Sequence, residues 1–191
     1  KRASAKKIEI GKQTYQKNSQ LINQVERKFK IEKELLLSLM GIETNFGQYL
    51  GKMDILSSLA TLSYDKRRSE FFTKELIIAL KLIDSNQIKA EELFGSWAGA
   101  FGNFQFMPST ILNNAIDYNG DKKIDLKSSE DSFASAANYL AKMGWRTKDK
   151  CFNRIELDNN IPLKYLNYSA RKIKNKKKLF FFKKYIINYN N

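Results

Sequence analysis

Residues 36–47 read LLSLMGIETNFG, and the interpretation of the first half of the chain starts from this stretch. Leu36, Leu39 and Met40 are spaced by three and four residues, which predicts the buried stripe of an amphipathic helix. The next position of that stripe, seven residues after Leu36, is Glu43. A carboxylate where another leucine is expected makes Glu43 the most informative residue of the chain.

The position of Glu43 predicts a chemical role. A carboxyl group against an apolar wall loses hydration in its charged form, so we expect the pKa of Glu43 to be raised, and the negative end of the helix dipole acts in the same direction. A carboxyl that is protonated near neutral pH can donate a proton to a glycosidic oxygen. The structural alternative is that Glu43 pairs with an Arg or caps a backbone group before Gly47.

The rest of the pattern predicts a mainly α fold. Four further stretches show helical spacing and start near Leu21, Phe72, Pro108 and Phe133. Ser128-x-x-Asp131 predicts a capping box for the last helix, and Gly144 its end. Three of the nine glycines lie in Gly95–Gly102, which predicts a loop with sharp turns or close backbone approaches.

Beyond residue 150 the helical period fades. Leu179–Phe182 and Tyr185–Ile187 are interpreted as two short strands. We therefore predict a helical core over residues 1–150 and a small, irregular or β-containing basic segment over 151–191.

Composition excludes several classes of active site. The chain of 191 residues has no His and a single Cys, Cys151, so it can form neither a His-ligated metal site, nor a Ser-His-Asp triad, nor a disulfide framework. Chemistry must rest on carboxylates, hydroxyls, amides, Lys or a hard cation. The sequence begins at Lys1 without an apolar leader, so we expect a targeting segment to be removed or never present. The apolar stretches are too short to span a bilayer.

The formal net charge of +14 is unevenly distributed. Residues 1–34 carry ten basic and four acidic side chains, residues 35–163 carry 15 and 16, and residues 164–191 carry nine and none. The cluster at Arg171–Lys178, beside Phe180–Phe182, is compatible with binding to nucleic acid or another anionic surface. The alternative is a solvated lysine-rich loop.

Several motifs, in order over roughly residues 15–146, resemble the lytic murein transglycosylases of the membrane-bound B type. They are Gly41-Ile42-Glu43-Thr44-Asn45-Phe46-Gly47, Ala60-Thr61-Leu62-Ser63-Tyr64-Asp65, Arg67-Arg68-Ser69-Glu70-Phe71-Phe72, Gly95-Ser96-Trp97-Ala98-Gly99-Ala100-Phe101-Gly102, Gln105-Phe106-Met107-Pro108-Ser109, Ala137-Asn138-Tyr139-Leu140 and Gly144-Trp145. Several long motifs in the right order are far more specific than any single pattern.

The resemblance implies a lysozyme-like fold and cleavage of the β-1,4 bond between N-acetylmuramic acid and N-acetylglucosamine in peptidoglycan. In that family one Glu, here Glu43, acts as acid and then as base, and a 1,6-anhydro ring forms without a cofactor. Ordinary glycosidases need two carboxylates; no second acid lies in a comparable motif here, although Asp54 or Asp65 could fold nearby. The alternatives are a hydrolytic lysozyme of the same fold, a non-catalytic peptidoglycan-binding scaffold, and a nucleic-acid binder. The resemblance favours a monomer in the periplasm or cell envelope of a Gram-negative bacterium, with glycan strands and no nucleic acid as partner.

The same matches imply substrate-binding residues. Ser96 and Gln105 match positions that hydrogen-bond the catalytic carboxyl or the sugar. Phe106, Tyr139 and Tyr189 match cleft-lining aromatics, and Tyr189 with Asn190 matches a pair on the far side of the cleft. For Phe106 ordinary core packing is the alternative. The family's longer insertion after Gly-Trp is absent, so the basic loop at Arg171–Lys178 is a candidate for contacting acidic peptide stems.

A calcium loop is also predicted. Asp117-x-Asn119-x-Asp121, followed by the carbonyl of Lys123, reproduces the first four ligand positions of an EF-hand loop. Lys122 replaces the usual Gly at position 6, and Ser128 stands at position 12. Some relatives carry such a site with the last acid displaced, as Asp131 is here. The alternative is an Asx-turn loop without an ion; any calcium would be structural.

Overall fold

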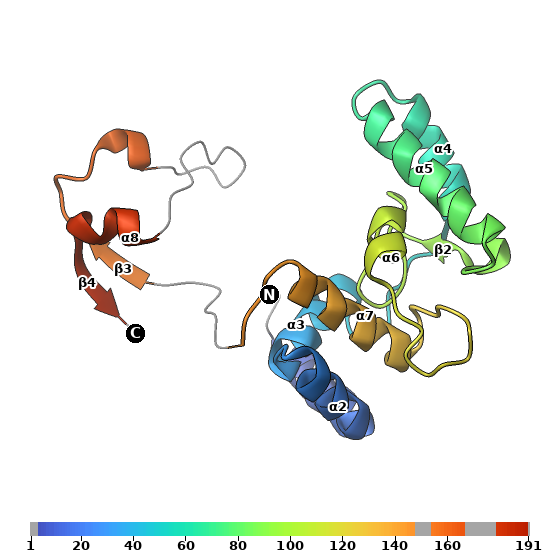
Figure 1. The fold of residues 1–191 in the computed structure, drawn as a ribbon, viewed down its shortest axis with the longest axis horizontal. Helices are drawn as coiled ribbons and strands as arrows, with labels where there is room; N and C mark the ends of the chain where they lie inside the picture. Colours follow the sequence, from blue (N-terminus) through green and yellow to red (C-terminus); the bar gives the residue numbers. More distant parts are fainter. Residues whose placement is uncertain (1–3, 148–153, 167–178, 191) are drawn as a thin grey trace. The chain divides into compact units, whose positions relative to one another are not determined.

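The computed structural model describes residues 4–147, 154–166 and 179–190 (Figure 1). Contacts between Cα atoms divide the chain into one unit over Lys1–Thr147 and another over Lys148–Asn191, and each is described by itself. Among the described residues, no helix combines the length and the apolar character needed to cross a membrane.

The described part of the first unit is built from seven α-helices, which confirms the mainly helical prediction. They are α1 (Ala5–Lys17), α2 (Ser19–Phe29), α3 (Lys33–Thr44), α4 (Ile55–Tyr64), α5 (Ser69–Asp84), α6 (Pro108–Asn114) and α7 (Ser129–Lys142). The strands β1 (Met53–Asp54) and β2 (Phe94–Gly95) pair antiparallel, and a 3-10 turn covers Ala90–Glu92. The sequence pattern missed α1 and α4; no residue of α1 is fully buried, so its apolar signal is weak.

The helices pack in pairs around one core. α4 lies along α5, α5 contacts α6, α2 contacts α7 and α1 contacts α3 (Figure 1). Leu36 of α3 and Phe133 of α7 are fully buried, and the ring of Phe104 meets Phe133 edge-on with centroids 5.5 Å apart. The core therefore joins the helix that carries Glu43 to α7 and to the loop that precedes α6.

Both ends of α7 follow the sequence signals in part. The Ser128 hydroxyl accepts a 3.2 Å hydrogen bond from the Asp131 amide, as an N-cap does. The carboxylate of Asp131 bonds other backbone groups, so the reciprocal half of the predicted capping box is not formed. At the other end Gly144 has φ of +89°, and the Trp145 amide donates to the Leu140 carbonyl, as in a Schellman motif.

The described part of the second unit is a small two-stranded piece. β3 (Arg154–Leu157) pairs antiparallel with β4 (Ile186–Asn190), and α8 (Leu179–Phe182) and the 3-10 turns Leu163–Tyr165 and Lys183–Tyr185 complete it. The predicted strand at Leu179–Phe182 is wrong. The rings of Phe181 and Phe182 both pack on Tyr165, with centroids 5.4 and 5.8 Å away, and neighbouring side chains of a strand point to opposite faces. The second strand, predicted at Tyr185–Ile187, begins at Ile186, one residue after the predicted start. Cys151 and Arg171–Lys178 lie outside the described residues.

Candidate active site

Glu43 lies in the last turn of α3 and is exposed. The buried stripe of this helix runs through Leu36, Met40 and Thr44, at intervals of four residues. Glu43 lies beside that stripe, so the expectation that it is buried against an apolar wall is wrong. The spacing correctly places Glu43 on the same side of the helix as Leu39, which is half-buried. The packing of the neighbouring helices decides which side of α3 is buried.

The backbone after Glu43 is unusual. Asn45, Phe46 and Gly47 all adopt left-handed φ values, of 51°, 60° and 81°. For a Phe this region costs about 1–3 kcal/mol, so the surrounding structure must compensate. The Phe46 amide donates to the Met40 carbonyl at 3.2 Å, and the Phe46 ring packs so closely on Gly41 that a Cβ there would lie 2.7 Å from Cζ. The turn ends α3 one residue after Glu43.

Thr44, the neighbour of Glu43, anchors this helix end. Its hydroxyl, which is fully buried, donates to the Asn103 carbonyl at 2.8 Å and accepts from the Gly47 amide at 3.0 Å. The Asn103 side chain in turn donates to the Ser132 hydroxyl and the Lys127 carbonyl, both at 3.0 Å. This buried network connects the end of α3 to the start of α7, and the sequence analysis did not predict it.

Four of the predicted site residues line one hollow of about 270 Å³. They are Glu43, Gln105, Phe106 and Tyr139. The rings of Phe106 and Tyr139 contact each other with centroids 5.6 Å apart, and Phe106 is buried, so it packs in the core as well as facing the hollow. The walls include Leu39, Met107 and Thr110, which the sequence analysis did not single out. Among the described residues that line this hollow, Glu43 is the only acid.

Gln105 is held in one orientation. It has a left-handed φ of 51°, and its side-chain nitrogen donates to the carbonyls of Leu50 at 3.2 Å and Gly102 at 3.0 Å. Because both partners are carbonyl oxygens, the amide nitrogen must face them. The Oε1 atom therefore remains the acceptor that Gln105 can offer, to a protonated carboxyl or to a sugar hydroxyl.

Ser96, another predicted binding residue, is not among the residues that line this hollow. Ser96 closes the turn of the glycine-rich loop: its hydroxyl accepts from the Ala100 amide at 3.0 Å, and its amide donates to the Ala100 carbonyl at 2.9 Å. Tyr189 and Asn190 belong to β4 of the second unit, where Tyr189 pairs with Ile155. The side chains of Tyr189 and Asn190 lie outside the described part of the chain.

A second carboxylate, missed by the sequence analysis, supports the wall of the hollow. Glu75 of α5 is buried and accepts from the Ser109 amide at 2.8 Å and the Ser109 hydroxyl at 2.6 Å. It thus caps the start of α6, which carries Thr110. Glu75 occupies the buried stripe of its helix together with Phe72, Ala79 and Leu82. In α5, a carboxylate within the buried apolar stripe is therefore a structural residue.

The predicted calcium loop contains Asx turns, which the alternative without an ion also predicts. Asp117 accepts from the Lys122 amide at 2.8 Å, Asn119 from the Asp121 amide at 3.0 Å, and Asp121 from the Lys123 amide at 2.9 Å. Lys122 has φ of 69°, the conformation for which a Gly is usual. Among the described residues, however, no three acids are gathered as around a metal ion.

Asp131, the last predicted ligand, ties the loop to α7. Its two carboxylate oxygens accept from the amides of Tyr118 at 2.8 Å and Asp125 at 2.9 Å. Burial raises the pKa of Asp131, although the hydrogen bonds from the backbone act in the opposite direction. The residue is fully buried. Its carboxylate accepts the hydrogen bonds of backbone amides that water would otherwise have to accept.

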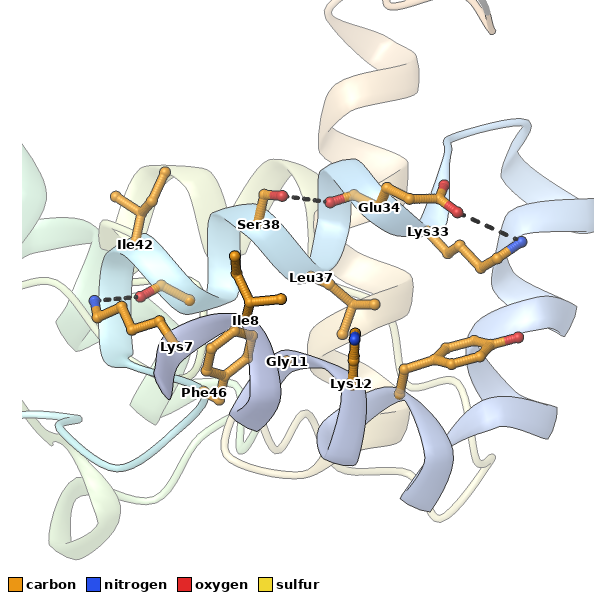
Figure 2. Close-up of a pocket in the computed structure, with 12 residues that line it drawn as sticks. Lys7, Ile8, Gly11, Lys12, Lys33, Glu34, Leu37, Ser38, Ile42 and Phe46 are labelled. Carbon is orange, nitrogen blue, oxygen red and sulfur yellow. Dashed lines mark hydrogen bonds and ion pairs between the residues drawn. The ribbon is translucent and has the colours of Figure 1, made fainter. Parts of the chain in front are cut away.

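A wider hollow of about 550 Å³ is lined by residues of α1 and α3, on another side of α3 (Figure 2). Ile8 and Ile42, each 56% exposed, lie on its sides, and Lys7 donates to the Gly41 carbonyl at 3.2 Å. Among the described residues that line it, Lys33 and Glu34 are an ion pair and Ser38 bonds within its own helix. It contains no predicted site residue and offers no group arranged for proton transfer.

Comparison with known proteins gives consistent matches. The family model described as Transglycosylase SLT domain matches residues 1–183. Membrane-bound lytic murein transglycosylase B of Escherichia coli strain K12 is 38% identical over 130 residues, which is 68% of this chain and 36% of that protein. The chain thus spans about a third of this relative's length.

Solved structures resemble the fold as well. The lytic transglycosylase Slt35 of Escherichia coli in complex with calcium is 34% identical, with a TM-score of 0.73 over 78% of this chain and 48% of that chain. SltB3 of Pseudomonas aeruginosa in complex with NAG-anhNAM-pentapeptide is 32% identical, with a TM-score of 0.77 over 83% of this chain and 43% of that chain.

Proposed function

Because this chain belongs to the family of transglycosylase SLT domains, we propose that it cleaves peptidoglycan as a lytic transglycosylase. The membership confirms the resemblance inferred from its motifs. The single observation that carries the proposal is that Glu43, Gln105, Phe106 and Tyr139, all from family motifs, line one hollow with no second acid among its described lining residues. The bond cleaved would be the β-1,4 bond between N-acetylmuramic acid and N-acetylglucosamine.

Glu43 would perform both proton transfers. As a carboxylic acid it donates its proton to the glycosidic oxygen, so the bond from that oxygen to C1 of the muramic acid breaks. As a carboxylate it then accepts the proton of the C6 hydroxyl while that oxygen bonds to C1. The products are a 1,6-anhydromuramic acid end and a free 4-hydroxyl, and no water is consumed. Asp54 caps α4 and Asp65 pairs with Arg67, so neither is placed as a second catalytic carboxylate.

The neighbouring side chains would position the sugar. The Oε1 atom of Gln105 can accept from the Glu43 carboxyl in its acid form or from a sugar hydroxyl. Tyr139 presents a ring to the apolar face of a pyranose. Because Glu43 is exposed in the free protein, the bound glycan itself would exclude water from the carboxyl during the reaction. Ser96, Tyr189 and Asn190 are proposed as further sugar contacts on the strength of the motifs alone.

Two observations favour transglycosylation over hydrolysis. A hydrolase of this fold needs a second carboxylate or a positioned water, and the described lining residues supply no further acid. The Pseudomonas relative binds a fragment that contains anhNAM, the product of ring closure without water. We place the reaction in the envelope of a Gram-negative bacterium, with glycan strands as partner and one copy of the chain supplying the catalytic hollow.

We propose a structural calcium ion at the loop of Asp117, Asn119, Asp121, the Lys123 carbonyl and Asp131. The EF-hand spacing of these residues, the left-handed φ of Lys122 at the sixth position and the Slt35 structure with calcium support it. When bound, the ion would offset repulsion among the carboxylates, and no step of the reaction uses it.

The test is the variant Glu43→Gln, which keeps the shape of the side chain and cannot release a proton. We expect it to release no muropeptides from purified sacculi while its circular dichroism and glycan binding stay unchanged. Mass analysis of wild-type products should give anhydromuramic ends. Reducing ends would show a hydrolase, and binding to sacculi without turnover by the wild type would show a scaffold. Anhydro products from Glu43→Gln would overturn the role of Glu43.

A further inference from the structure

A separate hollow of about 270 Å³ lies beside the glycine-rich loop. It is lined by Met53 and Asp54 of β1, Ser57 and Thr61 of α4, and Trp97. The Trp97 side chain is 68% exposed and that of Met53 is 54% exposed. None of these residues lines the hollow that contains Glu43, so this surface has no role in the proton transfers.

The polar groups around Trp97 suit a polyhydroxylated ligand. Asp54 accepts from the Ser57 amide at 2.6 Å, and hydrogen bonding by Ser57 lowers the pKa of Asp54, so the carboxylate is charged at neutral pH and can accept from hydroxyls. Thr61 donates to the Ser57 carbonyl at 2.8 Å, which leaves its oxygen as an acceptor. The indole adds a flat apolar face and one N–H donor.

Hydrogen bonds within the loop fix the backbone of the turn that carries Trp97. Ser96 and Ala100 form two hydrogen bonds across the base of the turn, of 2.9 and 3.0 Å. Gly99 has φ of +88°, and a Cβ there would lie 2.5 Å from Leu59, which is fully buried. Because the backbone is already fixed, a ligand on the exposed indole would have to order only its two side-chain torsions.

We propose that the Trp97 hollow is a saccharide-binding subsite that stacks one pyranose ring of a glycan strand on the indole. The apolar face of the sugar would lie on Trp97 and Met53, and its hydroxyls would meet Asp54 and Thr61. This inference rests on the proposed function for the identity of the polymer. Trp97 and Gln105 are eight residues apart, so they lie at most ~28 Å from each other, a distance that a strand of several linked sugars can span.

The experiment uses the two tryptophans as separate reporters. In ¹⁵N-labelled Glu43→Gln protein each indole N–H gives one resonance, and the resonance lost in the further variant Trp97→Phe is that of Trp97. Trp145→Phe provides the complementary assignment. On titration with chitotetraose, the β-1,4-linked tetramer of N-acetylglucosamine, we expect the Trp97 resonance to shift and saturate. The Trp145 indole, which donates to Glu32 at 2.8 Å, should stay in place.

Affinity gives the second measurement. By calorimetry Trp97→Ala should bind chitotetraose about tenfold more weakly. The control Tyr64→Ala removes a ring that is 92% exposed and does not line the hollow, and it should bind as the parent does. An unmoved Trp97 resonance at saturation, or parental affinity in Trp97→Ala, would overturn the subsite. Cleavage by Glu43→Gln alone would overturn the proposed function and leave this binding result standing.

Discussion

The hydroxyl of Thr44 donates a 2.8 Å hydrogen bond to the backbone carbonyl of Asn103, 59 positions further along the chain. Thr44 is fully buried and follows Glu43 directly, whereas Glu43 is exposed. The carboxylate is therefore accessible to substrate while its adjacent residue is fixed in the interior. We expect the position of the Glu43 carboxyl to depend on the hydrogen bond between Thr44 and Asn103.

The exchange Thr44→Val keeps the shape of the side chain and removes the hydroxyl. We expect a loss of about 1–3 kcal/mol in the free energy of unfolding, because the Asn103 carbonyl and the Gly47 amide lose a buried partner. Cleavage of sacculi should fall about tenfold or more, since a small shift of Glu43 misaligns the proton transfer. Urea unfolding and muropeptide release measure the two effects.

The matched control is Thr14→Val, whose hydroxyl bonds only the Ile10 carbonyl one turn earlier in α1. It should alter neither quantity by a comparable amount, and Thr44→Ser should restore both. Wild-type activity in Thr44→Val would show that the anchor does not position Glu43.

The buried carboxyl of Asp131 makes stability depend on pH. Its raised pKa in the folded state means that the folded protein binds the proton more tightly than the unfolded chain, whose Asp has a pKa of about 3.9. The favourable contribution of this group is therefore complete below pH 3.9 and is lost as the pH rises through the folded-state value. Compared with Asp131→Asn, the wild type should show a larger stability margin at pH 3.5 than at pH 6.5.

Urea unfolding of both proteins at the two pH values tests this, with chelator present because Asp131 is also a proposed calcium ligand. Because the Asp131→Asn exchange turns an amide nitrogen toward the backbone N–H of Tyr118 or Asp125, the variant should be the less stable protein throughout. A margin that grows with rising pH would mean that the backbone donors outweigh burial.

Calcium should stabilise the folded chain if the loop binds it. At a concentration a hundred times the dissociation constant, binding adds about 2.7 kcal/mol, which corresponds to several degrees in Tm for a chain of this size. We expect about 5 mM calcium to raise the Tm of the wild type and to leave that of Asp121→Asn unchanged. Asp84→Asn is the matched control, because Asp84 is an exposed acid at the end of α5, outside the loop.

Equal Tm values for the wild type with calcium and with chelator would contradict the calcium proposal. Cleavage should respond to calcium only as far as stability does, because no step of the reaction uses the ion.

Two carboxylates of the helical unit, Glu75 and Glu43, show how much helical periodicity can predict. Glu75 shares the buried stripe of α5 with Phe72, Ala79 and Leu82, and it proves to be a helix cap. Glu43 was selected by the same argument and is exposed, so the argument from burial was wrong for it. The motif around Glu43 still placed it with Gln105 and Tyr139 on one hollow, because a motif carries information on long-range contacts that a helical period lacks.

Leu179–Phe182 and α1 show that local sequence does not determine the structure of every short segment. Leu179–Phe182 has strand-like residues and is helical, because Tyr165, distant in sequence, packs against two successive rings. The helix α1 was missed because it contributes no buried residue, so its stability depends on neighbours that composition does not reveal.

The helical class, the ends of α7, the exclusion of His and disulfide chemistry, and the family of the chain could all be read from the order of its residues. These properties follow from local spacing, capping residues, composition and ordered motifs. Three others required the folded chain: Glu43 is exposed while Thr44 is buried, the amide nitrogen of Gln105 is bound to two carbonyls, and Trp97 lines a separate hollow. They depend on which surfaces of distant segments pack together. A periodic pattern does not say which side of a helix is buried, and the free energy of packing decides it.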